Sequence, residues 1–163
     1  LSFVRSEAKA IQAVGVPVLT ENVDIANARV EFEGGCVANI TASRVSLEDR
    51  RRIRIFQPES FVMVDYTSKK ANFFRRTPAS ADGGIKIESE AVRVEPGDAL
   101  ENEIRSFIRS AQRRDRPAVS GEEGKRALAL ALRIKEEIQR NLEKIPSIQS
   151  FYERREDLRE PPW

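Results

Sequence analysis

The sequence predicts an α+β domain, in which helices pack on one face of an open-faced, mainly antiparallel sheet. Two patterns support this prediction. Segments of alternating polarity separated by turns occupy residues 9–95, and apolar residues at helical spacing occupy residues 98–145. A run of strands followed by a run of helices is typical of α+β folds. The length of 163 residues suits one domain, and a hydrophobic content of 40% is sufficient for a packed core.

The strands follow from period-two alternation and from turn residues. The clearest pair is a hairpin whose strands, residues 24–32 and 37–43, are joined by Glu33, Gly34 and Gly35. Gly-Gly supplies the positive φ angles that a tight turn requires. Further strands are expected at residues 9–18, 51–57, 60–66, 71–76 and 85–95, with a flexible loop over residues 77–84.

The two expected helices are marked by their N-termini. Asp98 with Glu101, and Ser120 with Glu123, have the spacing of a capping box. The glycines that follow Ser120 also permit an anion site at this helix N-terminus, but the capping residues already account for the pattern. We therefore expect two capped helices, separated by a proline-containing break over residues 114–119.

The second helix carries a broad apolar surface near its start. Alanine and leucine fill most of the circumference over residues 127–132, so we expect the start of this helix to be deeply buried against the sheet. The apolar stripes are Leu100, Ile104, Phe107, Ile108 and Ala111 in the first helix, and Ala127, Ala131, Ile134, Ile138, Leu142 and Ile145 in the second.

The charge balance and the residue content limit the classes of partner and ligand that we expect. Lys and Arg number 28, Asp and Glu number 26, and acids and bases interleave, so we expect no nucleic-acid or membrane partner. No apolar run approaches the about 20 residues of a membrane span and no signal peptide is visible, so the expected location is cytoplasmic. Cys36 is the single cysteine and histidine is absent, so we expect no metal site in this chain.

Candidate ligand contacts lie where strands end. Ser43 and Arg44 end the hairpin, and arginine binds phosphate or carboxylate through two parallel hydrogen bonds. Tyr66 ends a later strand. We predict Ser43, Arg44 and Tyr66 as substrate-binding residues. Two alternatives stay open: Arg44 can pair with Glu48 or Asp49 instead, and Tyr66 can serve packing or capping alone.

The second face of the sheet has mixed polarity. Antiparallel sheets with one wet face often stack on a copy of themselves, so we predict a homo-oligomer through this face. Phe61, Phe73 and Phe74 would supply its apolar part, and a merely solvated face is the alternative. The other residues assigned to this face are Ile25, Asn27, Arg29, Asn39, Thr41, Ser43 and Met63.

Three stretches resemble the C-terminal domain of the Gfo/Idh/MocA oxidoreductase family, which includes glucose-fructose oxidoreductase and inositol dehydrogenase. They are DIANARVEFEGGCVANITASRVS from Asp24, RRIRIFQPESFVMVDY from Arg51 and LENEIRSFIRSAQRRDRPAVSGEEGKRALALALRI from Leu100. The resemblance covers residues 10–145, and RPAVSGEEGKRAL is its most specific part. Two shorter stretches, AVGVPV and TASRVS, are similar to family members that act on nucleotide-linked amino sugars.

The resemblance implies the fold of a glyceraldehyde-3-phosphate dehydrogenase-like C-terminal domain. Residues 1–145 would form a substrate and oligomerisation domain, and residues 146–163 a charged tail. The parent enzyme would transfer hydride between NAD or NADP and a hydroxyl of a sugar, nucleotide sugar or cyclitol. The cofactor would bind an N-terminal Rossmann domain, and a Glu-Lys-Pro motif would supply the catalytic lysine. Both are absent from this chain, so we predict no catalytic and no cofactor-binding residue in it.

Two other interpretations remain open at this point. The chain starts at Leu1 without an initiator methionine, and we expect it to be a piece of a longer protein. If it instead stands alone, it would be a non-catalytic α+β module for ligand sensing or oligomerisation. A third possibility is a family member that keeps the fold but has lost the catalytic lysine. The coding sequence upstream of Leu1 discriminates among the three.

Overall fold

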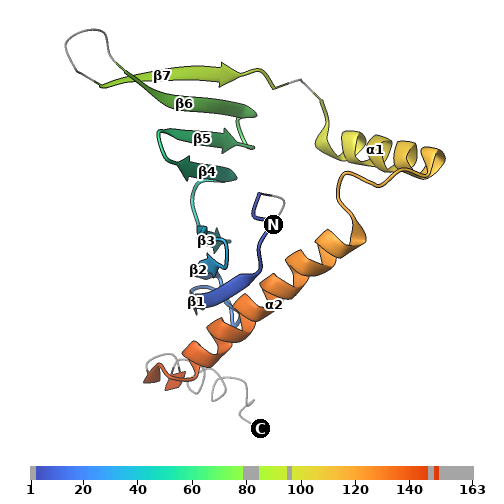
Figure 1. Cartoon of the computed structure of the whole chain (residues 1–163). Helices are drawn as coiled ribbons and strands as arrows, with labels where there is room; N and C mark the ends of the chain where they lie inside the picture. The colour runs from blue at the N-terminus through green and yellow to red at the C-terminus, as the bar shows by residue number, and fades with distance from the viewer. Residues whose placement is uncertain (1–2, 79–84, 95–96, 147–148, 151–163) are drawn as a thin grey trace. The chain divides into compact units, whose positions relative to one another are not determined.

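The computed structural model describes residues 3–78, 85–94, 97–146 and 149–150 (Figure 1). Most of the predicted loop over residues 77–84 and most of the predicted tail over residues 146–163 lie outside the described residues. The described part contains strands followed by helices, in the predicted order. The strands are β1 (Ala8–Val16), β2 (Ile25–Phe32), β3 (Val37–Ser43), β4 (Arg52–Gln57), β5 (Ser60–Asp65), β6 (Lys70–Pro78) and β7 (Ile85–Val92), and the helices are α1 (Ala99–Arg113) and α2 (Gly121–Leu142).

The chain divides into two compact units. Unit 1 comprises residues 1–46 and 109–163, and unit 2 comprises residues 47–108. Unit 1 holds a three-stranded antiparallel sheet in the order β1-β2-β3, together with α2, whereas unit 2 holds a four-stranded antiparallel sheet in the order β4-β5-β6-β7. The α+β class is therefore confirmed. Within the described ranges, the strands form two hydrogen-bonded sheets, where the sequence analysis expected one.

The β2–β3 hairpin of unit 1 forms as predicted. Gly35 has a φ of 80°, and the Phe32 N–H donates to the Cys36 carbonyl at 2.9 Å. Glycine adopts this left-handed conformation at little cost, which explains its place in the turn. Alternate β2 residues then point to one face, where Ala28 and Val30 are buried with Phe32. The period-two pattern thus assigns the buried face of this strand correctly.

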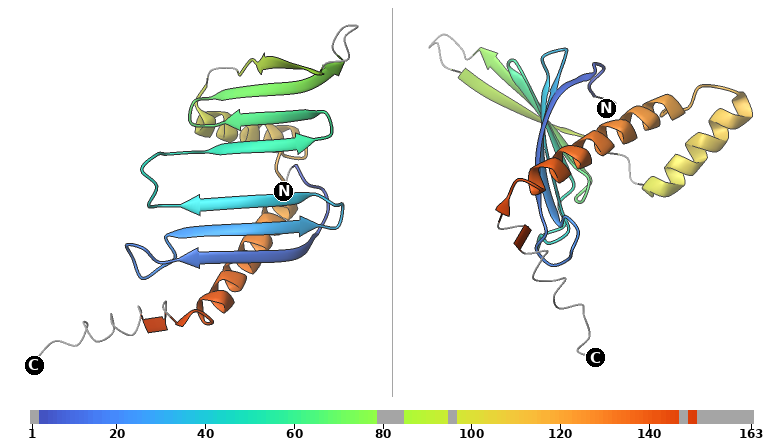
Figure 2. Two further views of the ribbon diagram at one scale, coloured as in Figure 1. Left: turned by 90° about the vertical axis from the view of Figure 1, so that its left-hand side faces the viewer. Right: turned by 90° about the horizontal axis from the view of Figure 1, so that it is seen from below.

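Helix α2 covers this face of the unit 1 sheet. Ile138 and Leu142 pack on Ala13 of β1 and Ala28 of β2, and Figure 2 shows α2 running across the three strands. The N-terminus of α2 is closed by the predicted capping box, because the Ser120 Oγ accepts from the Glu123 N–H and the Glu123 carboxylate accepts from the Ser120 N–H. The structure confirms this helix start and locates the core at the C-terminal half of α2.

The expected deep burial of residues 127–132 is wrong. Leu128 is 61% exposed and Leu132 is 50% exposed, and Ala127 and Ala131 of the apolar stripe are exposed as well. The buried residues of α2 are Ile138 and Leu142. The reason is geometric. A helix of 22 residues is about 33 Å long, whereas three strands span only about 10 Å between the outermost two. The sheet of unit 1 therefore covers only part of the apolar stripe.

The unit 2 sheet places its phenylalanines on both faces. Phe61 pairs with Phe74 and Val62 pairs with Phe73 across β5 and β6. The Phe61 and Phe74 rings stack with centroids 4.1 Å apart, and Phe56 of β4 lies 5.7 Å from Phe61. The expectation that Phe73 shares this face is wrong, because consecutive strand residues point to opposite faces.

Helix α1 begins as predicted but buries no residue. The Asp98 Oδ1 accepts from the Glu101 N–H at 2.9 Å, so Asp98 is the N-cap. The Glu101 carboxylate binds Arg105 within the helix instead of returning to the cap. No residue of α1 is buried, and the side chains of its stripe, from Leu100 to Ile108, remain exposed. The expected packing of a helix on a sheet is therefore observed for α2 on the unit 1 sheet, whereas α1 buries no residue.

Candidate functional site

The structure places the predicted contact residues Ser43 and Arg44 in unit 1 and Tyr66 in unit 2. Ser43 ends β3, and its Oγ accepts from the Val45 N–H at 3.2 Å. Tyr66 follows β5, where its N–H donates to the Arg51 carbonyl at 2.8 Å and its ring is exposed. Ser43 and Arg44 thus lie together at one strand end of unit 1, whereas Tyr66 belongs to unit 2.

Asp24, in the loop between β1 and β2, is the centre of a hydrogen-bonded network. Its Oδ2 accepts from the N–H groups of Val18, Leu19 and Thr20 at 2.8, 2.7 and 2.8 Å. Its Oδ1 accepts from the Thr20 Oγ1 at 2.8 Å. The bond from the Thr20 N–H, helped by the others and opposed by burial, holds the pKa of Asp24 well below its usual range. The network therefore fixes a charged carboxylate in one place.

Arg44 lies directly opposite Asp24. Its N–H donates to the Asp24 carbonyl at 2.9 Å, which extends the β2–β3 ladder by one pair. Its Nε lies 3.5 Å from the Asp24 Oδ1. Glu48 and Asp49, the partners considered from the sequence, pair with the next two arginines along the chain. The ionic partner of Arg44 is therefore Asp24.

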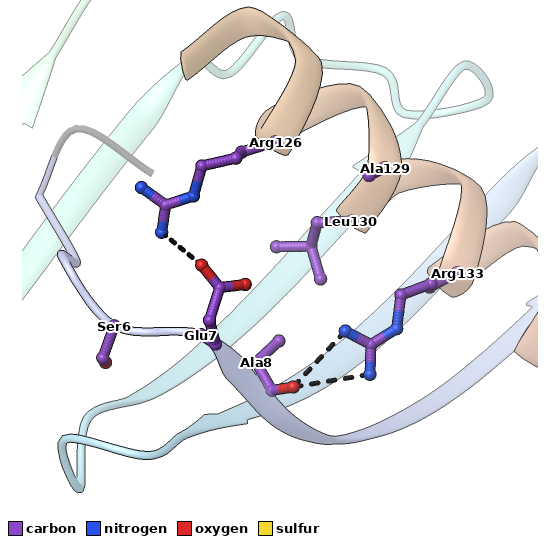
Figure 3. A pocket seen from close by; sticks show the side chains of 7 residues that line it. All are labelled: Ser6, Glu7, Ala8, Arg126, Ala129, Leu130 and Arg133. Carbon is purple, nitrogen blue, oxygen red and sulfur yellow. Dashed lines mark hydrogen bonds and ion pairs between the residues drawn. The ribbon is translucent and has the colours of Figure 1, made fainter. Parts of the chain in front are cut away.

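A shallow pocket lies between α2 and the segment that leads into β1 (Figure 3). The Arg126 Nη2 lies 2.9 Å from the Glu7 Oε1, and the Arg133 guanidinium donates to the Ala8 carbonyl at 3.3 and 3.4 Å. Both arginines are thus engaged with unit 1 itself, and they tie α2 to the start of β1. The pocket is lined by Ser6, Glu7, Ala8, Arg126, Ala129, Leu130 and Arg133.

The described residues show neither the Gly-rich turn of a dinucleotide site nor a cluster of metal ligands. A dinucleotide site needs a Gly-rich turn between a strand and a helix. Gly34 and Gly35 join two strands instead, and the N–H group of Glu123 in the first turn of α2 is already bonded to Ser120. In the described ranges, no group of three acidic or cysteine side chains could hold a metal ion. No helix there is long and apolar enough to cross a membrane.

Sequence reasoning missed Asp24, the residue on which this site is centred. The available signal was an aspartate just before a strand and shortly after Pro17, since aspartate side chains commonly bond nearby backbone N–H groups in turns. The pocket residues Glu7, Arg126 and Arg133 were also missed. Their approach depends on the packing of α2 along β1, for which no local pattern exists in the sequence.

No family model matches the chain, but a curated protein does. The chain is 33% identical over 135 residues to UDP-N-acetylglucosamine 3-dehydrogenase from Acidithiobacillus ferrooxidans, covering 83% of this chain and 43% of that protein. A solved structure of that dehydrogenase matches with a TM-score of 0.73 and 32% identity, over 82% of this chain and 41% of that one. The chain thus spans about two fifths of the length of its relative.

Two more distant structures share the fold. An aldose-aldose oxidoreductase from Caulobacter crescentus, complexed with glycerol, has a TM-score of 0.61 and 20% identity, over 83% of this chain and 40% of that one. An NAD-binding protein from Listeria innocua has a TM-score of 0.61 and 18% identity, over 85% and 41%. At these identities the likeness concerns the fold alone. Together with the closer relative, it confirms the resemblance: the chain is a Gfo/Idh/MocA-like C-terminal domain.

Proposed function

We propose that this chain is the substrate-binding and assembly part of an NAD(P)-dependent oxidoreductase that acts on a nucleotide-linked amino sugar. The observation that carries the proposal is the 33% identity with UDP-N-acetylglucosamine 3-dehydrogenase over 83% of the chain. Hydride would pass between the sugar carbon and the nicotinamide, which a separate cofactor domain would bind. The residues of this chain would form the wall of the substrate site, and Ser43, Arg44 and Tyr66 are its candidate contacts.

The substrate is tested with the protein expressed from its complete reading frame. We expect UDP-N-acetylglucosamine to drive formation of NADH from NAD, or NADPH from NADP, with a keto group appearing on the sugar. Comparing the two cofactors at equal concentration assigns the preference between them. A preparation that is folded and binds the cofactor but produces no reduced cofactor with this sugar would remove the substrate assignment.

We also propose that the protein assembles with copies of itself through its sheet faces. In unit 1, the face opposite α2 carries exposed Val14, Val16 and Val37 beside polar residues. In unit 2, the exposed ring of Phe56 stacks on Phe61, which stacks in turn on Phe74, and the latter two rings are half-buried. Burying such apolar surface against a second copy is the usual source of affinity in homo-oligomers. Sedimentation velocity across a concentration series tests the assembly.

A further inference from the structure

The backbone at Arg44, where β3 ends, is fixed by hydrogen bonds although the arginine side chain is exposed. The Arg44 N–H is bonded to the Asp24 carbonyl, and the next residue, Val45, donates its N–H to the Ser43 Oγ. The backbone is therefore tied on both sides of Arg44. The Asp24 N–H in turn donates to the Val16 carbonyl of β1 at 3.0 Å, so Asp24 joins two neighbouring segments.

The carboxylate that faces Arg44 is rigid and charged. The Asp24 side chain is 0% exposed, and the backbone of residues 18–20 surrounds one of its oxygens. The other oxygen accepts from Thr20 and lies 3.5 Å from the Arg44 Nε. A buried carboxylate with this many donors cannot follow a moving partner, so the attraction between the charges orients Arg44.

The guanidinium of Arg44 is nevertheless available to a ligand. Its side chain is 61% exposed. Across the described parts of the chain, the structure records no hydrogen bond from this guanidinium, because its contact with Asp24 is an ion pair without hydrogen-bond geometry. A guanidinium carries five N–H donors in a fixed plane, and two parallel ones match two oxygens of a phosphate. Arg44 thus combines a held backbone with a side chain that is mostly exposed.

We infer that Asp24 is a positioning residue that presents Arg44 to the diphosphate of a nucleotide sugar. This inference rests on the proposed function, since the sugar nucleotide is the substrate class proposed there. Arg44 is the contact residue: it supplies two parallel hydrogen bonds and one positive charge to the phosphate oxygens. Asp24 acts through Arg44 and does not touch the ligand. The pocket arginines are less suited, because Glu7 and the Ala8 carbonyl already occupy them.

Binding is measured by calorimetry with UDP, inorganic pyrophosphate and neutral N-acetylglucosamine, using the protein from the complete reading frame. R44A removes the charged contact and its two hydrogen bonds, so it should lower the affinity for UDP about tenfold to hundredfold. R44K keeps the charge but not the planar pair of donors, so it should lose most of this affinity as well. R50A is the matched control, because Arg50 is an exposed, ion-paired arginine in unit 2. Its UDP affinity should equal that of the wild type.

The role of Asp24 is tested by a double-mutant cycle. D24N should weaken UDP severalfold in the wild-type background and have no further effect in the R44A background. With the sugar nucleotide as substrate, D24N should raise its KM and leave the KM for the nicotinamide cofactor unchanged. A merely structural role would lower stability and the active fraction without this selective change. If D24N does not fold, D24E keeps the charge and displaces it by one methylene, and its effect on UDP should also vanish in R44A.

Two results would overturn the inference: R44A binding UDP as the wild type does, or D24N weakening UDP equally with and without Arg44. A wild-type protein that binds neither UDP nor pyrophosphate would overturn it as well. The proposed function fails separately. If UDP binding depends on Arg44 but UDP-N-acetylglucosamine gives no reduced cofactor, the oxyanion site stands and the reaction assigned to the protein is wrong. If turnover is normal in R44A, the reaction stands and the oxyanion site is wrong.

Discussion

The side-chain amide of Asn141 in α2 donates a 2.8 Å hydrogen bond to the carbonyl of Ala13 in β1, across 128 residues of sequence. Ala13 is buried, and the hydrogen bond to its carbonyl is partly shielded from water. The same amide also donates to Glu137 one turn earlier in the helix. The bond thus ties α2 to β1 beside the buried cluster that Ala13 forms with Ala28, Ile138 and Leu142.

Replacing Asn141 by alanine should lower the free energy of unfolding by about 1–3 kcal/mol, because the buried Ala13 carbonyl loses its partner. Urea unfolding followed by circular dichroism measures the difference. Q139A is the matched control, since Gln139 is an exposed amide side chain two residues away on the same helix. Equal midpoints for N141A and Q139A would show that the bond to Ala13 does not stabilise unit 1.

Gly15 allows α2 to lie close to β1. A Cβ at this position would stand 2.6 Å from the Val23 Cγ1 and 2.8 Å from the Ile138 Cγ2. G15A should therefore displace the helix or the loop and destabilise the protein by about 1–3 kcal/mol, as overpacked cores do. Gly124 provides the opposite case, because a Cβ there meets nothing within 4 Å. G124A should stabilise α2 by about 0.5–1 kcal/mol.

Thermal unfolding of the two glycine variants beside the wild type checks both signs at once. The pair is informative because each variant adds the same single methyl group. A G15A protein as stable as the wild type would mean that the Val23 and Ile138 side chains leave more room for a Cβ at position 15 than these distances allow. A destabilised G124A protein would mean that the start of α2 contacts something beyond the residues described.

The hairpin and the helix caps could be predicted because their signals are local. Gly34 and Gly35 specify a turn, and Ser120 with Glu123 specifies a helix start, whatever the rest of the fold does. The partner of Arg44 could not be predicted in this way. Sequence proximity favoured two acids four and five residues away, whereas the pairing of β2 with β3 brings in Asp24 from twenty residues away.

Burial along α2 could not be predicted either, because the sequence does not state how wide the sheet beneath a helix is. The apolar stripe continues towards the start of α2 over Ala127 and Ala131, but both are exposed because the unit 1 sheet does not extend beneath them. The assignment of Phe73 is different, since alternation alone places it opposite Phe74. That error was avoidable from the sequence. The substrate and the assembly state depend on the shape and chemistry of exposed surfaces, which the periodicity of a sequence does not predict.

The stability of unit 2 should depend on acid pH through Asp65. The Asp65 carboxylate accepts from the Ser68 N–H at 3.0 Å and binds Arg52 at 2.6 Å, and these contacts, that of Ser68 first, lower the pKa of Asp65 from 3.8 to about 2. Since the folded-state pKa is depressed, the stabilisation is complete above the unfolded pKa of 3.8 and is lost as the pH falls through about 2.

The comparison of D65N with the wild type isolates this contribution. The wild type should be more stable than D65N at neutral pH, and the gap should close as the pH falls from about 4 towards 2. Thermal unfolding at several pH values measures the gap, and carbon NMR of the Asp65 carboxyl measures the pKa directly. A carboxyl that titrates at the ordinary aspartate value would show that the bonds from Ser68 and Arg52 do not persist in solution.

Self-association should depend on Phe56. This side chain is 68% exposed at the edge of the aromatic stack, with the Arg54 guanidinium 5.9 Å from its ring centroid. Because it is so exposed, F56D should leave unit 2 folded while placing a charge in any interface formed by this face. We expect F56D to shift the protein from oligomer to monomer at micromolar concentration, measured by sedimentation velocity and light scattering.

L47D is the matched control, since Leu47 is fully exposed in the same unit but lies outside its strands. A wild-type protein that is already monomeric, or an F56D protein that remains as oligomeric as L47D, would exclude this aromatic face as the assembly surface.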